Sequence, residues 1–213
     1  MRASRQGAPG QVAIQKRLQD EVLTLAEAHF LGKRSDIFWI TTLEFLRRHE
    51  LETSQRQSEV TFSGRFLRQT YGPVCPEVYD STRQLLEAGL LEEDARGRAR
   101  TITPLGERLF ATLQSSIDEP TLIAIRDLSI TLKRLTFGQL KRRVYALEVN
   151  WNGRMVPVAD IPIGACIYNH PTNWLQVVPT DVLKSFHASL ESSKPCRISD
   201  EIESLEELEE ALA

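Results

Sequence analysis

The chain has little of what marks secreted and membrane-spanning proteins. It contains three cysteines in 213 residues, an odd number at irregular spacing, which argues against a secreted disulfide framework. It has no run of 18 or more apolar residues, and no apolar segment of a signal peptide follows its basic first dozen residues. We therefore expect a cytoplasmic protein with reduced thiols.

Motifs that position a nucleophile, a metal ion or a nucleotide phosphate are also missing. The four histidines are scattered, and none belongs to an HExxH pattern; GxSxG and P-loop patterns are absent as well. One set of zinc-binding residue types has a spacing that matches no common zinc module. Its members are Cys166, His170, His187 and Cys196. We predict a protein that acts by binding rather than by catalysis, with no metal and no cofactor.

Charge is present in quantity but is unevenly distributed. Charged residues make up 26% of the chain and hydrophobic residues 41%, and the net charge is -3. Lys and Arg minus Asp and Glu is +3 over residues 1–150 and -6 over residues 151–213. This asymmetry indicates a body that tolerates polyanions and a tail that repels them or pairs with a basic surface. The alternative is that the tail simply presents a solvated acidic face.

Two amphipathic helices are predicted in the first fifty residues. Apolar residues at spacings near four cover residues 12–31 and continue over residues 36–49. The segment LGKRSD separates them, and Ser35 or Asp36 is the expected N-cap of the second helix. A polar loop then leads to a third apolar segment near Phe62.

The stretch YGPVCPEVYDSTRQLLEAGLLEEDARGRARTITPLGE, residues 71–107, is the most informative part of the chain. Pro76 suits the first position of a helix over residues 76–88, and Gly89 is a suitable stop. Tyr79 is expected on the buried face of this helix, as a core residue.

A hairpin is predicted directly after that helix. Residues 90–93 and 100–103 flank the turn DARGRA, and Thr103 before a proline caps the next helix. Helix, helix, helix, hairpin, helix is the order of a winged helix. We therefore predict a mainly α fold with a small β-hairpin wing: a winged helix-turn-helix domain over residues 12–150, after a disordered N-terminus (1–11) and before a C-terminal extension (151–213).

Several segments resemble a known family. "FWITTLEFLRRHE", "YGPVCPEVYDSTRQLLEAGLL" and "ITPLGERLF" are similar to the SocA-like (Panacea) antitoxin family and its YwgA-type winged-helix relatives, and "LTFGQLKRRVYALEVNW" resembles the helix that follows the winged unit in those relatives. The resemblance covers residues 35–150, and the Tyr-Gly-Pro step is its most specific part. It implies a non-enzymatic module that is used as an antitoxin or protein-interaction element in some members and, in winged helices generally, for DNA.

Cys75 departs from that family. The relatives often have a small hydroxyl residue at this position, so the cap of the helix over residues 76–88 is weakened or replaced here. At a helix N-terminus the Cys75 thiol could have a lowered pKa and sense oxidants; the alternative is a small buried residue at a turn.

A duplex-DNA interface is predicted on the helix over residues 76–88 and on the wing. Ser81, Arg83 and Gln84 are expected to be exposed, and the last two could address base edges in the major groove. Glu77 and Asp80, near the start of the same helix, oppose nearby phosphates.

The wing supplies the positive charge of the predicted interface. Arg96, Arg98 and Arg100 alternate, so the period of a strand places them on one face, where they can contact phosphates. The alternative is an exposed hairpin edge that carries charge for solubility. A second basic cluster, equally well explained as a solvated helix face, consists of Lys133, Arg134, Lys141, Arg142 and Arg143.

The tail contains two further amphipathic segments. A helix capped by Thr180 has Val182, Leu183, Phe186 and Leu190 on one face, and an acidic helix follows over residues 199–213. Its apolar positions are Ile202, Leu205, Leu208 and Leu212. These either pack on the body of the same chain or anchor the tail in a groove of a partner protein.

These patterns favour a cytoplasmic DNA-binding protein of bacterial type that regulates transcription. The alternative is an antitoxin or adaptor that acts through protein–protein interaction with a cognate toxin or another partner.

Overall fold

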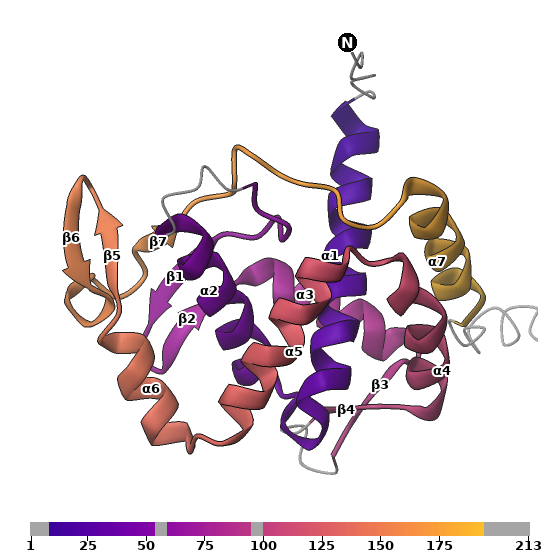
Figure 1. The fold of residues 1–213 in the computed structure, drawn as a ribbon, viewed down its shortest axis with the longest axis horizontal. Coiled ribbons are helices and arrows are strands. Elements are labelled where there is room, and N and C mark those ends of the chain that lie inside the picture. The colour runs from indigo at the N-terminus through magenta and orange to yellow at the C-terminus, as the bar shows by residue number, and fades with distance from the viewer. Residues whose placement is uncertain (1–8, 54–58, 95–99, 194–213) are drawn as a thin grey trace, which may run out of the picture.

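The computed structural model describes residues 9–53, 59–94 and 100–193. Within these ranges the chain forms seven α-helices and three small antiparallel sheets (Figure 1), so the prediction of a mainly α fold is confirmed. The helices are α1 (Pro9–Leu31), α2 (Ile37–Thr53), α3 (Pro76–Glu87), α4 (Pro104–Leu113), α5 (Glu119–Lys133), α6 (Phe137–Tyr145) and α7 (Thr180–Ser193). The strands are β1 (Phe66–Gln69), β2 (Gly72–Val74), β3 (Leu91–Glu93), β4 (Arg100–Ile102), β5 (Glu148–Trp151), β6 (Arg154–Pro157) and β7 (Cys166–Tyr168). Short 3-10 turns lie at Gly32–Arg34, Gln114–Ser116 and Val158–Asp160.

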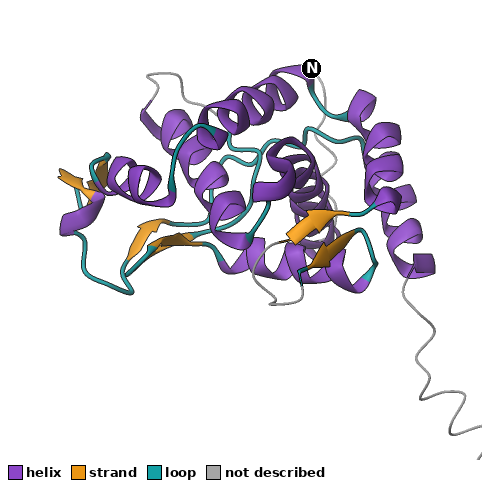
Figure 2. Cartoon of the chain, turned by 90° about the horizontal axis from the view of Figure 1, so that it is seen from below, coloured by secondary structure: helices purple, strands orange, loops and turns teal. Residues whose placement is uncertain are grey.

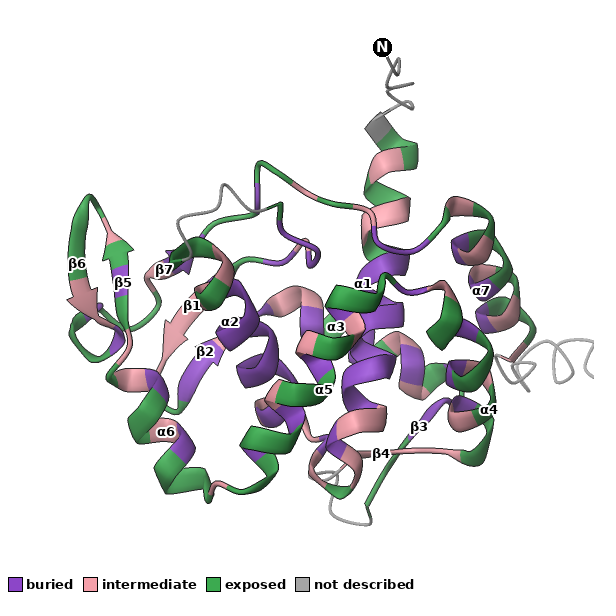
Figure 3. Cartoon of the chain, viewed as in Figure 1, coloured by how far each residue is buried: buried purple, intermediate pink, exposed green. Residues whose placement is uncertain are grey.

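Helix α1 is the centre of the molecule. It contacts α2, α3, α4, α5 and α7, and its residues from Leu18 to Ala28 are buried around the whole circumference (Figure 3). The buried set includes the polar side chains of Gln19, Asp20, Glu21, Thr24 and Glu27. The expectation of an amphipathic helix with one apolar face is therefore too simple, because helices cover α1 on several sides. The predicted disorder over residues 1–11 is wrong from Pro9 onward, and residues 1–8 lie outside the described part.

One buried amide on α1 ties two distant segments together. The Gln19 Nε2 donates to the carbonyls of Thr61 at 2.7 Å and Leu175 at 3.0 Å. Its Oε1 accepts from the backbone N–H groups of Val177 at 2.8 Å and Val178 at 3.3 Å. Because every polar atom of this side chain has a backbone partner, its complete burial leaves no unsatisfied group.

The third apolar segment forms strands. β1 pairs antiparallel with β2 and with β7, in the order β2-β1-β7. Since β7 lies about a hundred residues after β1, the C-terminal part of the chain completes this sheet. The expected domain boundary at residue 150 falls inside β5, and the hydrophobic core includes Ile167, Val178 and Phe186 from beyond it.

Helix α3, the hairpin and α4 follow one another as the local sequence signals predict. Pro76 is the first residue of α3, and Gly89 follows its C-cap with a φ of +66°, which favours glycine. β3 and β4 pair antiparallel, and the Thr103 side chain accepts from the N–H of Gly106 at 3.1 Å to cap α4. Figure 2 shows the β3–β4 pair as a separate ribbon beside the helices.

The remaining helices have clear end signals. Asp36 accepts from the N–H of Trp39 at 3.0 Å and so caps α2, while Thr136 and Gln139 form a capping box at the start of α6. The helix predicted from Thr180 is α7, which packs on α1 through Leu183, Phe186 and Leu190. Among the residues that the structure describes, no helix combines the length and the apolar character needed to cross a membrane.

Candidate binding surfaces

The outer face of α3 differs from the predicted DNA-reading face. Ser81 was expected to be exposed and is only 2% exposed, because it lies with Val78 and Leu85 on the side of the helix that faces the core. Tyr79 was expected in the core and is 46% exposed. Both expectations are wrong for one reason: the helix phase that buries Val78 and Leu85 turns Tyr79 outward and Ser81 inward.

The charged residues of α3 and of the hairpin form an acidic surface. We define the α3–hairpin surface by its charged residues: Glu77, Asp80, Arg83, Glu87, Glu92, Glu93, Asp94 and Arg100. Six acids against two arginines give a net charge of -4, and adding Arg96 and Arg98 from the turn leaves -2. The surface is therefore negative with or without the turn, whose residues 95–99 lie outside the described part.

Both described arginines of this surface are already paired. The Arg83 guanidinium lies 3.0 Å from Asp80, and that of Arg100 lies 2.8 Å from Glu93 across the hairpin. Gln84, the other predicted base contact, is half-buried. Each arginine would have to exchange a carboxylate partner for a phosphate in order to contact DNA.

A polar cleft opens beside the first turn of α3. Its volume is about 360 Å³, and its walls include Lys16, Asp20, Ser63, Glu77 and His170. Ser63 donates to Asp20 from its backbone N–H at 2.9 Å and from its hydroxyl. Burial nevertheless raises the pKa of Asp20 well above its ordinary value, and the carboxylates of Glu44 and Glu77 act in the same direction.

Cys75, directly before α3, is buried and its thiol is not activated. Its S–H donates to the Glu77 carboxylate at 3.3 Å, and its side chain does not cap α3. Burial first, and the negative charge of Glu77 second, raise the pKa of the Cys75 thiol. The hypothesis of a lowered thiol pKa at the helix N-terminus is therefore wrong, since desolvation outweighs the helix dipole.

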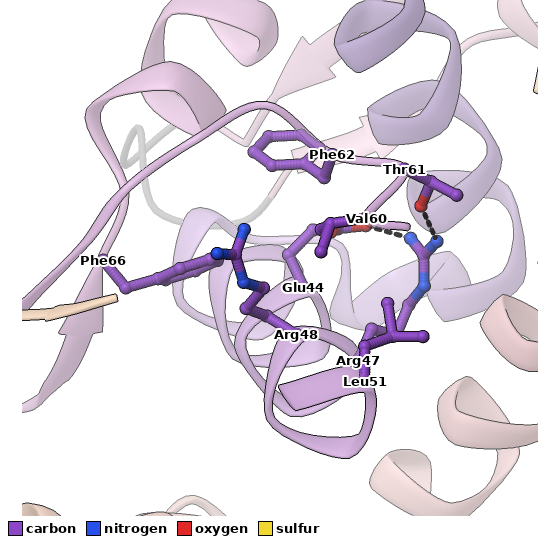
Figure 4. A pocket seen from close by; sticks show the side chains of 8 residues that line it. All are labelled: Glu44, Arg47, Arg48, Leu51, Val60, Thr61, Phe62 and Phe66. Atoms are coloured by element: carbon purple, nitrogen blue, oxygen red, sulfur yellow. Dashed lines mark hydrogen bonds and ion pairs between the residues drawn. The ribbon is translucent and has the colours of Figure 1, made fainter. Parts of the chain in front are cut away.

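A buried ionic cluster joins α1, α2 and the segment before β1. Arg47 lies 3.2 Å from Glu27. It also contacts Glu44 and donates to the Thr61 hydroxyl at 2.8 Å (Figure 4). Burial raises the pKa of Glu44 although Arg47 opposes the shift. The cavity beside these residues measures about 10 Å³, which is far too small for a metabolite. The cluster therefore fixes the fold rather than a ligand.

A second exposed surface, on the last turn of α5 and on α6, is positive. Residues 128–147 contain five basic residues and no acidic one. We define the basic–aromatic surface by the following residues: Arg68, Tyr71, Lys133, Arg134, Phe137, Lys141, Arg142, Arg143 and Tyr145. Tyr71 is 67% exposed and Phe137 is 47% exposed. The Lys141 ammonium lies 5.1 Å from the ring centroid of Tyr71 and 5.6 Å from that of Tyr145.

This surface was visible in the sequence only in part. The sequence alone shows that no acidic residue lies near Lys141, and it predicts the five basic residues as a cluster. Tyr71 and Arg68 come from β1 and the β1–β2 turn, about seventy residues earlier, and their place beside α6 depends on the tertiary fold.

Other predicted site residues cannot be placed. Arg96 and Arg98 of the wing, the tail anchors Ile202, Leu205, Leu208 and Leu212, and Cys196 lie outside the described residues. In the part of the chain that the structure describes, no group of three or more His, Cys, Asp or Glu side chains is placed to hold a metal ion.

Comparison of the chain with protein-family models, with curated proteins and with solved structures finds no match. The resemblance to the SocA-like family stays a prediction.

Proposed function

We propose that the protein is a non-enzymatic adaptor or antitoxin that binds a basic partner protein through its α3–hairpin surface. The observation that carries this proposal is the charge of that surface, which is -4 over the described residues. Carboxylates placed along a helix repel a phosphate backbone, whereas they attract and orient a protein surface rich in Lys and Arg. Exposed Tyr79 supplies an aromatic contact of the kind that often dominates the binding energy of interfaces.

The order α3, hairpin, α4 supports a winged helix-turn-helix arrangement for this part of the chain. In that arrangement α3 would be the recognition helix and β3–β4 the wing. The unit then offers a protein partner the same elements with which other winged helices contact DNA. The acidic helix of the tail, with Ile202, Leu205, Leu208 and Leu212, is proposed as a second contact to the partner.

A DNA-binding regulator remains the second candidate, because the hairpin turn contains two arginines. In this proposal Arg96, Arg98 and Arg100 contact phosphates while Arg83 and Gln84 reach base edges. Alanine at the three wing positions should then weaken duplex binding and lower the salt slope by up to ~3. Ser81 no longer belongs to this set, since it is buried.

Charge reversal separates the two candidates. We expect the triple variant Asp80→Lys, Glu87→Lys, Glu92→Lys to lose a basic protein that co-purifies with the parent chain and to gain affinity for duplex DNA. The matched control reverses three exposed acids elsewhere: Glu50, Glu148 and Asp181. It changes the net charge equally and should keep the partner.

The measurements are mass spectrometry of the co-purified proteins and a gel-shift titration of a 20-bp duplex. Two results together would overturn the adaptor proposal in favour of the regulator. The parent protein would bind the duplex tightly and lose that binding when the three wing arginines are replaced with alanine. The charge-reversal variant of α3 would keep the same co-purified proteins as the parent.

A further inference from the structure

The basic–aromatic surface has unused positive charge. Lys133, Arg134, Arg142 and Arg143 are exposed, and within the described residues none of them is in an ion pair. This contrasts with Arg83 and Arg100 on the α3–hairpin surface, which are both paired. Cations without a carboxylate partner can meet a polyanion without first breaking an ion pair.

Rings and cations alternate across this surface. Phe137, Lys141 and Tyr145 are spaced four residues apart and therefore share one face of α6. The Lys141 ammonium lies near the rings of both Tyr71 and Tyr145, and the Arg68 guanidinium lies 5.1 Å from the centroid of Tyr145.

The two most exposed rings of this surface each have a neighbouring side chain in the fold. The Phe137 ring packs against Phe38 with centroids 4.6 Å apart, and the Tyr71 ring is next to Lys141. A Cβ on Gly72, the first residue of β2, would lie 3.3 Å from the Phe38 ring, so β2 and α6 both approach Phe38. Both rings thus have a neighbour in the fold while much of their area stays exposed.

We propose that the basic–aromatic surface binds single-stranded nucleic acid. Phosphates would lie along the cations, and bases would stack on Tyr71 and Phe137. Proteins that bind single strands without sequence specificity likewise contact the backbone with basic residues and the bases with aromatic rings. A duplex satisfies the cations equally well but keeps the faces of its bases stacked inside, so it leaves the exposed rings without a partner. The observations therefore favour a single strand over a duplex.

The proposal goes beyond partner-protein binding and does not depend on it. The two surfaces have opposite charge and come from different elements, so the α3 reversal variant should keep its affinity for oligonucleotides.

The test is fluorescence anisotropy with three labelled probes: a 20-nucleotide oligothymidylate, a 20-nucleotide oligouridylate and a 20-bp duplex. Vesicles containing anionic phosphatidylserine serve as the fourth probe. Titrations at several salt concentrations give the salt slope. We expect single strands to bind more tightly than the duplex, and the two single strands show whether the sugar matters.

Two variants separate charge from stacking. Lys141→Gln, Arg142→Gln, Arg143→Gln should reduce the salt slope by about 2, since each phosphate contact to a single strand contributes about 0.7. Tyr71→Ala with Phe137→Ala should weaken single-strand binding about tenfold and leave the salt slope unchanged. Glutamine keeps the helix propensity of lysine and arginine, so α6 should remain folded, which a circular dichroism melt verifies.

The control replaces three exposed cations outside the surface, Arg108, Arg154 and Lys184, with glutamine. Full single-strand binding by this control supports the assignment. The proposal is overturned if no oligonucleotide binds, or if vesicles bind and oligonucleotides do not. It is also overturned if the control loses as much affinity as the α6 variant. A duplex that binds more tightly than the single strands, together with no effect of the ring variant, would overturn it as well.

Discussion

The α3–hairpin surface has two described arginines, the basic–aromatic surface has six arginines and lysines, and the two sets differ in their partners. Around α3 each described arginine has a carboxylate within 3.0 Å, whereas around α6 Lys141 and Arg68 lie near aromatic rings and the other described cations are exposed. A net charge of -3 for the whole chain conceals this separation. The comparison teaches that the position of a cation in the sequence does not reveal whether a carboxylate already pairs with it in the fold.

The largest effect is expected in the buried ionic cluster, which belongs to neither surface. Arg47→Ala leaves the buried carboxylates of Glu27 and Glu44 without their cation and should lower the free energy of unfolding by ~3–5 kcal/mol. Urea denaturation measures this. A combined Arg47→Met, Glu27→Gln, Glu44→Gln variant should lose less, because no buried charge then stays unpaired; an equal loss in both variants would argue against the charge explanation.

The hairpin is held to its place on the acidic side by a close approach at Gly106. A Cβ there would lie 2.3 Å from the carbonyl oxygen of Leu90, so Gly106→Ala should cost ~1–3 kcal/mol of unfolding free energy. The matched change on the basic side is Gly138→Ala in α6, where a Cβ meets nothing within 4 Å. It should be neutral or slightly stabilising. Similar thermal shifts for the two variants would contradict this difference between the two surfaces.

The stability of the protein should depend on pH through Asp20, which lies in the cleft beside α3. The pKa of Asp20 is raised in the folded state, so its contribution to stability is present below its unfolded pKa near 3.8 and is lost as pH rises through the folded pKa. Asp20→Asn preserves an acceptor for the Ser63 N–H and removes the titration. Its stability relative to the parent should therefore grow with pH, by up to ~1.4 kcal/mol per pH unit. Parallel stability curves between pH 3.5 and 8 would show that Asp20 does not titrate this way.

Tyr79 tests the orientation of α3. Because its side chain is partly in water, Tyr79→Ala should cost at most ~1 kcal/mol of stability, while Phe110→Ala in the core should cost ~3–5 kcal/mol. Differential scanning calorimetry compares the two. A Tyr79 variant that melts as early as the Phe110 variant would place that ring in the core and remove it from the proposed interface.

The smallest effect is expected at the exposed ion pair of α3. Arg83→Ala breaks a contact to Asp80 in which both side chains are mostly exposed, so the stability change should stay below ~0.5 kcal/mol. Its effect on duplex DNA is the more informative readout: a large loss of affinity would show that Arg83 leaves Asp80 for a phosphate or a base.

Local signals predicted the elements around α3 well. Pro76, Gly89 and Thr103 act within a few residues of themselves, through φ preference and capping, and each has the role in the structure that the sequence indicates. The burial of Tyr79 and Ser81 was predicted wrongly. The rotation of α3 about its axis is set by Val78 and Leu85, which face the core, and the hydrophobicity of Tyr79 alone does not bring its side chain to that face.

Long-range pairing accounts for most of what the sequence did not reveal. β1, β2 and β7 are three or four residues long, and β7 reaches β1 from about a hundred residues away, so no local period marks the sheet. Asp20 likewise meets Ser63 and Glu77 in one cleft only through the tertiary fold. The basic residues of α6 could be predicted as a cluster, but the aromatic partner from the β1–β2 turn could not.

The amide of Gln19 has a consequence for how the chain is made. The ribosome synthesises α1 long before Leu175, Val177 and Val178. The backbone groups of these three residues form hydrogen bonds with the Gln19 amide in the folded protein. Until then water must solvate the Gln19 side chain, because burying it early would leave its donors and acceptors without partners. The central helix of the nascent chain therefore stays accessible to water on this side, and the core is completed only after residues 175–178 have been synthesised.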